Sequence, residues 1–292
     1  MRLIILALVT FLAFPLAAKA DAVYDRVMAS STLRCGYMLY PPYMDKDPNT
    51  GSFSGVAYDF VMALAKQVNL KVEWVEEVPI GQEPAALAAN RIDAVCASTG
   101  SYNPDFFMRV DMTDPMFYVR NDIYARADDA RFKGPIVAGM IDKDNVTFAA
   151  IDGDSTAVYP ALIFPHAKQN RLTALSSPAQ LFQEILGHKA DLVMAETAVA
   201  TNATKANPAA FIRLDWQGPP LPHYGLAIAI RKDADQLLRS LNETIEFMNA
   251  NGTIDTILDK HDPGHQALIP VPKPYQQRWP FPLAGNRPPE AR

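Results

Sequence analysis

Cysteine and histidine are scarce in this chain, whose 292 residues contain two cysteines and five histidines. No Cys-X-X-Cys motif or Cys/His cluster occurs. His261 and His265 are separated by Pro263 and Gly264, which prevent the two imidazoles from sharing one helical face. The sequence also offers no Ser/His/Asp or Cys/His catalytic set. We therefore expect neither a metal site nor a bound cofactor.

Long apolar runs are confined to the N-terminus. A basic start at residues 1–2 precedes the apolar run 3–16, and Ala18-Lys19-Ala20 places small residues at the spacing of a cleavage site. A membrane-spanning helix needs ~20 apolar residues, so this run is too short to be one. We interpret residues 1–20 as a signal peptide that is cleaved on export to the periplasm, leaving a mature chain that starts near Asp21 and does not insert into the membrane.

An excess of positive charge is absent as well. Without Arg2 and Lys19 the chain retains 25 Lys and Arg against 32 Asp and Glu, a net charge of −7. This balance argues against nucleic acid or an anionic membrane as the main partner. The hydrophobic fraction of 49% and charged fraction of 20% are those of a globular protein with an ample core.

The two cysteines, Cys35 and Cys96, form an even pair in an exported chain, which permits a disulfide. Each lies in a β-branched or apolar run, so two buried free thiols are the alternative. A disulfide requires Cα atoms roughly 4.4–6.8 Å apart, which the sequence does not establish. Both interpretations stay open.

Strands and helices alternate along the first part of the chain. In residues 55–68, Val56, Phe60, Leu64 and Val68 recur at four-residue spacing, which predicts an amphipathic helix. The neighbouring patterns predict strands at 32–40, 71–75 and 92–97 and a short helix at 83–90. This alternation is typical of a parallel α/β sheet.

A second β/α series begins near Ile136. Ser177 to Gln180 form a capping box with proline at the first helical position. The pattern around it predicts strands at 148–151, 172–175 and 190–195, and helices from 155 to about 168, from 178 to 186 and from 197 to about 205. A strand at 122–126 leads out of the first series and one at 224–230 returns to it, followed by helices at 234–248 and 254–260.

These elements predict an α/β protein of two lobes, the second inserted into the first, with a ligand cleft between them. We expect lobe 1 to comprise residues 21–124 and 225–262 and lobe 2 residues 125–224, with crossings near 122–128 and 218–226. Residues 263–292 are rich in proline and lack periodicity, which predicts an extended, partly ordered tail.

The loop from Ser98 to Tyr118 is the first candidate for a ligand site. Hydroxyl and glycine residues follow a buried strand, and Pro104 suits the first position of a short helix, whose N-terminus attracts anions. Loops at the carboxyl ends of strands bind ligands in open α/β sheets. An ordinary surface loop is the alternative from this stretch alone.

The order of several segments resembles the family 3 extracellular solute-binding proteins, the periplasmic receptors of ABC importers for polar amino acids. The segments are LRCGYMLYPPY, GVAYDFVMALAKQVNLKVEWV, AALAANRIDAVCAS, VDMTDPMFY, AAIDGDST, YGLAIAIRKD and NGTIDTILDK. The resemblance covers roughly Thr32 to Lys260. It implies a two-lobed type II periplasmic-binding fold, a small-molecule ligand and a membrane permease as partner for a monomeric receptor.

In lobe 1 the resemblance implies that Tyr40 and Tyr43 flank the place of an aromatic ring that packs on the ligand. Ser101 matches a hydroxyl residue that commonly bonds the ligand carboxylate, and Ser98 and Tyr102 belong to the same loop. The arginine that usually clamps the α-carboxylate is replaced by Phe106. Substitution of that arginine by Arg109 on a shifted loop is the alternative.

In lobe 2, Asp154 occupies the usual threonine position, with Ser155 and Thr156 following, and Glu196 stands where the family has an aspartate for the α-amino group. An acid at position 154 repels a carboxylate. Two buried acids require a cationic or hydrogen-donating partner. We therefore expect a cationic or neutral polar solute held also by tyrosine and phenylalanine faces, rather than a standard α-amino acid.

Two other functions remain compatible with the sequence. Relatives on this scaffold include cyclohexadienyl dehydratases, in which a cleft carboxylate acts as general acid, and Glu196 stands at a suitable position. Their substrates are dicarboxylates, and the missing arginine argues against them. An accessory or sensor role in a periplasmic redox system, served by the proline-rich tail, is the third hypothesis.

Overall fold

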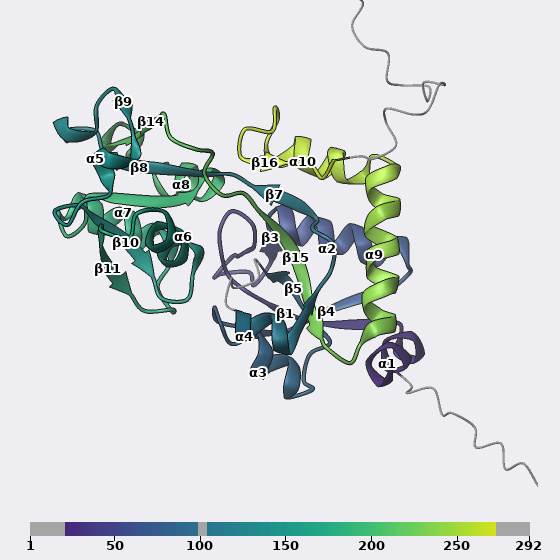
Figure 1. Ribbon diagram of the computed structural model, residues 1–292. Helices are drawn as coiled ribbons and strands as arrows, with labels where there is room; N and C mark the ends of the chain where they lie inside the picture. Colours follow the sequence, from purple (N-terminus) through teal and green to yellow (C-terminus); the bar gives the residue numbers. More distant parts are fainter. Residues whose placement is uncertain (1–20, 99–103, 273–292) are drawn as a thin grey trace, which may run out of the picture.

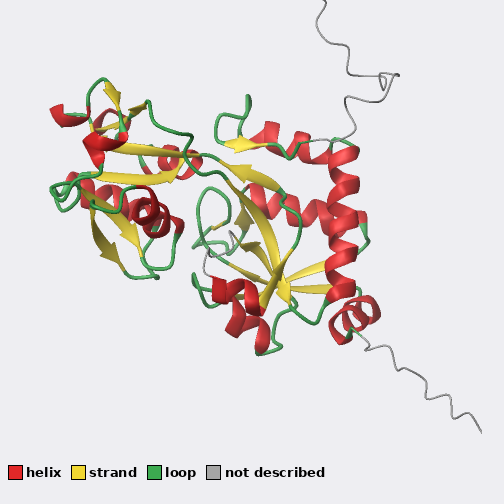
Figure 2. Cartoon of the chain, in the orientation of Figure 1, coloured by secondary structure: helices red, strands yellow, loops and turns green. Residues whose placement is uncertain are grey.

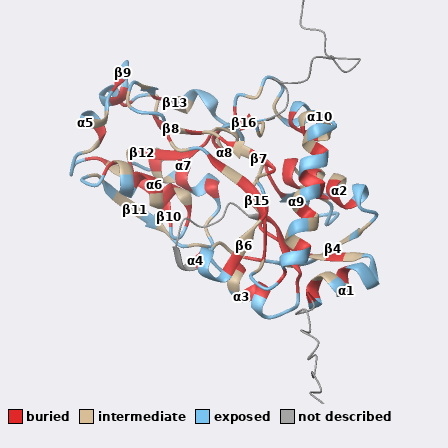
Figure 3. Cartoon of the chain, turned by 45° about the vertical axis from the view of Figure 1, so that its right-hand side comes forward, coloured by how far each residue is buried: buried red, intermediate tan, exposed pale blue. Residues whose placement is uncertain are grey.

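The chain folds into two α/β lobes, each built on its own β-sheet. The computed structural model describes residues 21–98 and 104–272. Figure 1 shows the lobes side by side, joined by strands that run from one to the other, and Figure 2 shows helices packed around the sheet of each lobe. Buried residues gather on the strands and on the inner faces of the helices (Figure 3). The expected two-lobed α/β architecture is confirmed.

The larger sheet belongs to lobe 1 and has the strand order β16-β7-β15-β5-β1-β4, with β6 also pairing with β15. β1 is parallel to β4 and β5, whereas β15 is antiparallel to β5, β6 and β7. Its strands are β1 (Thr32–Tyr37), β4 (Lys71–Glu77), β5 (Ala94–Ser98), β6 (Val110–Met112), β7 (Phe117–Val119), β15 (Tyr224–Arg231) and β16 (Leu268–Ile269).

The smaller sheet belongs to lobe 2 and has the strand order β11-β10-β12-β8-β13. β10 is parallel to β11 and β12, and β8 is antiparallel to β12 and β13. Its strands are β8 (Asn121–Arg126), β10 (Thr147–Ile151), β11 (Lys168–Leu172), β12 (Leu192–Glu196) and β13 (Phe211–Arg213). Two short pairs complete the strands, β2 (Asp45–Lys46) with β3 (Phe53–Ser54) and β9 (Pro135–Ile136) with β14 (Asp215–Trp216).

Helices cover both sheets. Those of lobe 1 are α1 (Ala22–Ser30), α2 (Val56–Gln67), α3 (Glu83–Ala88), α4 (Pro104–Arg109), α9 (Asp235–Ala250) and α10 (Thr253–His261). Those of lobe 2 are α5 (Ala138–Ile141), α6 (Ser155–Ile163), α7 (Pro178–Leu186) and α8 (Thr197–Ala203), with 3-10 turns at Ala130–Phe132 and Pro208–Ala210. Of the expected stripe, Val56, Phe60 and Leu64 of α2 are buried, whereas Val68 follows the helix and is exposed. At the start of α7, the Gln180 side chain accepts a hydrogen bond from Ser177 N–H at 2.8 Å, as the capping box predicts.

The first passage between the lobes lies at Arg120, between the end of β7 and the start of β8. β8 pairs with β12 and β13, so it belongs to the smaller sheet, although the sequence placed residues 121–124 in lobe 1. The Arg120 N–H donates to Ala267 O at 3.0 Å and its carbonyl accepts from Thr197 N at 2.8 Å. One residue thus bonds to both lobes.

Two elements differ from the expected boundaries in lobe 2. Helix α6 ends at Ile163 rather than near residue 168, and β11 covers 168–172 rather than 172–175. The physical cause is Pro165, which disfavours helical geometry at the preceding Phe164, whose φ and ψ are −127° and 67°.

The two ends of the described chain both pack on lobe 1. Helix α1, which the sequence pattern did not indicate, starts at Asp21, whose carboxylate accepts from Val23 N at 3.1 Å and Tyr24 N at 2.9 Å. The same carboxylate accepts from the first turn of α9 at Gln236 N, at 2.8 Å. At the other end, β16 pairs with β7. The part of the tail that is described is therefore ordered.

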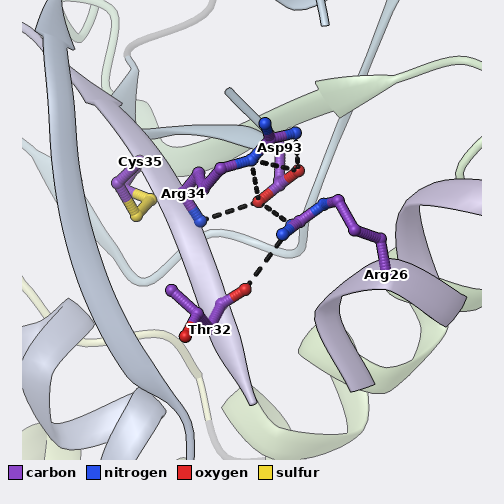
Figure 4. Close-up of a disulfide and its surroundings, with 6 residues drawn as sticks. Arg26, Thr32, Arg34, Cys35 and Asp93 are labelled. Atoms are coloured by element: carbon purple, nitrogen blue, oxygen red, sulfur yellow. Dashed lines mark hydrogen bonds and ion pairs between the residues drawn. A yellow bond between two sulfur atoms is a disulfide. The ribbon is translucent and has the colours of Figure 1, made fainter. Parts of the chain in front are cut away.

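A buried ion cluster and a disulfide tie β1 to β5. Cys35 and Cys96 form a disulfide with Cα atoms 5.5 Å apart, and both residues are fully buried. Asp93, 1% exposed, accepts hydrogen bonds from Arg34 N at 2.7 Å, from the Arg34 guanidinium at 2.9 Å and from Arg26 of α1 (Figure 4). This cluster lies where β5 begins, at the opposite end of the strand from the loop that follows Ser98.

Candidate functional site: a buried acidic pair between the lobes

The loop after β1 presents two tyrosines to the junction of the lobes. Tyr40 and Tyr43 lie on a tight turn in which Tyr40 N donates to Met44 O at 2.9 Å and Tyr43 N donates to Tyr40 O at 3.0 Å, and their rings are parallel with centroids 6.2 Å apart. Gly55, with φ of 119°, holds this turn against α2. A Cβ at Gly55 would lie 2.2 Å from Tyr43 O, so only glycine fits the close approach.

Asp154 reaches the same place from lobe 2. It is the N-cap of α6, and its Oδ1 accepts from Thr156 N at 2.8 Å and from Ser155 Oγ at 3.3 Å. Its Oδ2 accepts from the Tyr40 hydroxyl at 3.5 Å. One oxygen of the Asp154 carboxylate thus caps helix α6, and the other accepts a hydrogen bond from lobe 1.

Glu196 ends β12 and is fully buried. Its Oε2 accepts from the Tyr40 hydroxyl at 3.5 Å, and its Oε1 accepts from the hydroxyl of Tyr224, the first residue of β15. Ser155 Oγ lies 3.0 Å from the same Tyr224 hydroxyl. We call Asp154 and Glu196 the acidic pair, because one tyrosine hydroxyl from lobe 1 joins them.

The acidic pair is enclosed by hydroxyl and apolar groups. Burial, and then the charge of Asp154, raises the pKa of Glu196 to about 7. Burial also raises the pKa of Asp154. The pKa values of Tyr40, Tyr43 and Tyr224 are raised well above their ordinary range by burial and, in second place, by a carboxylate of the pair, so these residues stay neutral donors.

A cavity beside the pair is lined by Met38, Tyr40, Tyr43, Met44, Ala97, Asp154 and Leu226. The Tyr43 side chain is buried, and its hydroxyl has no hydrogen-bond partner among the described residues. A buried polar group without a partner is costly, so the cavity wall offers both negative charge and a free hydrogen-bonding group to a bound molecule. The described residues contain no group of His, Cys, Asp and Glu arranged to hold a metal ion.

The structure separates the expected site residues into groups. Tyr40, Tyr43, Asp154, Ser155 and Glu196 come together at the acidic pair. The Thr156 hydroxyl accepts from Ile151 N at 3.0 Å beneath the turn, which makes it a support for Asp154. Ser98 ends β5 and only its backbone is described, while Ser101 and Tyr102 lie outside the described residues.

The structure corrects the expectation that the Phe106 side chain lies at the ligand site. Its side chain is 4% exposed and packs in the core of lobe 1 with Val78, Leu87, Ile92, Val95, Val110 and Ala229. An apolar ring is more stable in that core than beside two carboxylates, so its burial is explained by packing rather than by ligand contact. Arg109, the suggested substitute for the missing arginine, lies exposed on α4.

Tyr224 is the site residue that sequence reasoning missed. Its place at the start of the strand returning from lobe 2 was visible, but the pattern YGLAIAI indicates only a strand. What makes Tyr224 part of the site is its hydroxyl, which bonds Glu196 and Ser155 across the junction. A polar end on a residue that opens a buried strand was the available signal.

Two lobes with a small cavity at their junction, lined by apolar side chains, two tyrosines and Asp154, have the arrangement of a two-lobed binding protein. Comparison with known proteins gives the family. The profile of bacterial extracellular solute-binding proteins, family 3, matches residues 33–263, and the chain belongs to this family.

Among curated relatives, a probable histidine-binding protein of Neisseria gonorrhoeae is 24% identical over 226 residues, covering 76% of this chain and 79% of the relative. An L-arginine-binding protein of Pseudomonas aeruginosa is 25% identical over 238 residues, covering 76% and 84%. Among solved structures, an ancestral amino acid-binding protein described as a precursor of cyclohexadienyl dehydratase aligns with a TM-score of 0.68 at 28% identity, covering 81% of this chain and 97% of that one. These names describe the relatives and support a solute-binding role for this chain.

Proposed function

We propose that this protein is a periplasmic receptor that captures a small cationic solute between its lobes and delivers it to the permease of an ABC importer. The acidic pair is the observation that carries the proposal. Asp154 and Glu196 are 6% and 0% exposed, and in the described residues their side chains bond only to hydroxyl and backbone N–H groups. A buried carboxylate without a cationic partner is energetically costly, and either a proton or a bound cation relieves that cost.

The rest of the cleft supports the same ligand class. The Tyr40 and Tyr43 rings offer apolar and cation–π surface, and the Tyr43 hydroxyl offers one hydrogen bond. The relatives named for arginine and histidine bind amino acids with basic side chains, which agrees with a cationic ligand. An acid at position 154 disfavours a ligand carboxylate at the N-terminus of α6. A cationic amine or guanidine without an α-carboxylate fits this surface best.

The proposed receptor is exported and acts as a monomer. Residues 1–20 are the signal peptide and the mature chain starts near Asp21, whose carboxylate caps α1 and α9. Of the helices in the described part of the chain, none has the length and apolar character that crossing a membrane requires.

The test is calorimetry on the mature chain with four probes: L-arginine, L-lysine, agmatine and L-glutamate. We expect the cationic probes to bind and L-glutamate not to bind. Agmatine, which is arginine without its carboxylate, should bind at least as tightly as L-arginine. Glu196→Gln should weaken binding of the best probe by at least about tenfold, the effect of losing one charged hydrogen bond.

Glu184→Gln is the matched control, because Glu184 lies in lobe 2 but bonds Asn170 and Lys189 outside the cleft. It should leave the affinity unchanged. Binding of L-glutamate in preference to the cations would overturn the proposed ligand class.

One observation favours a second candidate function. A pKa of about 7 makes Glu196 a competent general acid at neutral pH, and one structural neighbour is described as a precursor of a dehydratase. A dehydratase would use the Glu196 proton to expel a leaving hydroxyl as water. If Glu196→Gln kept its affinity for a hydroxylated substrate but lost turnover, the enzymatic alternative would replace the transport role.

A further inference from the structure

We propose that the acidic pair exchanges a proton for its cationic ligand, so that solute capture is coupled to pH. This inference rests on the proposed function and adds how the site is regulated. In the free protein the pair holds one proton, and when a cation binds between the lobes this proton is released to solvent while the ligand remains charged.

The geometry limits how much negative charge the pair can hold. The Tyr40 hydroxyl has one proton but lies 3.5 Å from both Asp154 Oδ2 and Glu196 Oε2, so it donates to one carboxylate at a time. The two oxygens are therefore within twice that distance of each other. Two carboxylates that share one hydroxyl donor and are shielded from water repel each other, which disfavours ionisation of both at once.

The remaining bonds to the pair do not supply a positive charge. Tyr224 donates to Glu196 Oε1, and Thr156 N–H and Ser155 Oγ bond Asp154 Oδ1. No Lys, Arg or His of residues 21–98 and 104–272 forms an ion pair with either carboxylate. Helix dipole and hydroxyl groups lower the energy of one carboxylate, but they do not balance two.

The elements packed around the pair bring hydroxyl groups and further acids to it. The β1 loop contributes Tyr40 and Tyr43, the start of α6 contributes Ser155, and β15 contributes Tyr224. After β12, the Thr197 hydroxyl donates to Asp122 at 2.7 Å, and the nearby guanidinium of Arg120 pairs with the same Asp122 at 3.7 Å. The charge of Asp262 acts on Tyr43 and contributes to the raised pKa of that residue. These surroundings favour the protonated state of the pair, in agreement with the raised pKa values of both acids.

A ligand cation replaces the missing positive charge. Once an ammonium or guanidinium lies beside both carboxylates, ionisation of the second acid is favoured and its proton leaves. Below the pKa of the pair, the affinity should therefore rise up to about tenfold per pH unit, and above it the affinity should level off. Arginine and agmatine keep their guanidinium charge throughout this range.

The experiment is calorimetry with L-arginine and with agmatine between pH 5 and pH 8, repeated near pH 6 in phosphate and in Bis-Tris, which both buffer there and differ in ionisation enthalpy. Near pH 6 we expect about one proton to be released per cation bound, and a dissociation constant that falls as pH rises. Glu184→Gln should behave as the wild type. If cations bind with an affinity that does not change with pH and release no proton, the inference is overturned and the proposed function stands. If no cation binds at any pH, the proposed function itself is refuted.

Glu196→Gln removes the exchangeable proton, and its residual binding should be independent of pH. If this variant binds too weakly to measure, the stability of the free protein provides the second readout. The folded-state pKa of Glu196 is raised from 4.5 to about 7, so the free energy of unfolding of the wild type should fall between about pH 4.5 and pH 7 relative to Glu196→Gln. Parallel stability curves for the two proteins would contradict a shared proton.

Discussion

Two buried carboxylate sites in this protein have opposite surroundings. Asp93 of lobe 1 receives the guanidinium groups of Arg26 and Arg34 and the Arg34 N–H (Figure 4). The acidic pair, which is just as deeply buried, receives hydroxyl and backbone donors and forms no ion pair in the described chain. Asp93 is thus neutralised within the fold, whereas the described chain supplies no cation to the pair, as the proposed cationic ligand requires.

The position of each site along the strands agrees with this difference. Asp93 directly precedes β5, at the end of the sheet away from the cleft, whereas Glu196 ends β12 and Asp154 follows β10. Carboxyl ends of strands are where open α/β sheets bind ligands. We therefore expect the acid before β5 to stabilise the fold, and the acids after β10 and at the end of β12 to serve the proposed binding site.

The largest expected loss of stability follows removal of the disulfide, which lies in lobe 1 near Asp93. Cys35 and Cys96 are separated by 61 residues in sequence, and a loop of that length predicts a stabilisation of about 4 kcal/mol from restricting the unfolded chain. The double substitution Cys35→Ala/Cys96→Ala should lower the free energy of unfolding in urea by that amount. A loss below about 1 kcal/mol, or two titratable thiols in the native wild type, would be inconsistent with this role.

Asp93→Ala should have the next largest effect. It leaves Arg26 and Arg34 without their shared partner, and removing one member of a buried ion pair costs about 3 kcal/mol when the remaining charges keep some access to water. Both arginine side chains do, with 32% and 26% exposure. Urea unfolding should show this loss, whereas the affinity for the cationic probe should be unchanged.

Glu76→Gln is the control for Asp93→Ala, since it breaks an ion pair with Arg91 that is open to solvent. Such a pair contributes less than about 1 kcal/mol. If the two variants lost equal stability, the contrast between neutralised buried acids and ordinary surface pairs would not hold.

The smallest effect is expected at Tyr43. Tyr43→Phe removes a buried hydroxyl that has no partner among the described residues, so the free protein should gain about 1 kcal/mol of stability. The same change should weaken binding of the best cationic probe by up to about tenfold, because the ligand loses a hydrogen bond. A variant that gains stability but loses affinity for the probe would show that the Tyr43 hydroxyl serves binding rather than folding.

Tyr37→Phe is the matched control. Tyr37 is also buried, but its hydroxyl accepts from Lys46 Nζ at 3.3 Å away from the acidic pair. This variant should lose a little stability and keep its affinity. Equal gains in both variants would mean that the Tyr43 hydroxyl has no special role.

Local patterns predicted much of the fold and part of the site. The spacing of Val56, Phe60 and Leu64 predicted helix α2, and the alternation of strands and helices in two series predicted two lobes. The resemblance to the family 3 solute-binding proteins indicated Asp154 and Glu196, because each stands at a ligand position where the family usually has another residue. Phe106 was misplaced, because the spacing from Pro104 does not say whether a residue on a short helix faces the cleft or the core.

The sequence by itself determined the alternation of strands and helices, the apolar N-terminus and the types of residue at the cleft. These depend on neighbours a few positions apart, for which periodicity and propensity suffice. Tertiary structure alone decided that Cys35 bonds Cys96, that Arg26 and Arg34 neutralise Asp93, and that Tyr40 and Tyr224 enclose the acidic pair. The physical reason is that burial and charge balance arise from residues far apart in sequence, and only the packing of both lobes sets which carboxylates find a cation within the chain.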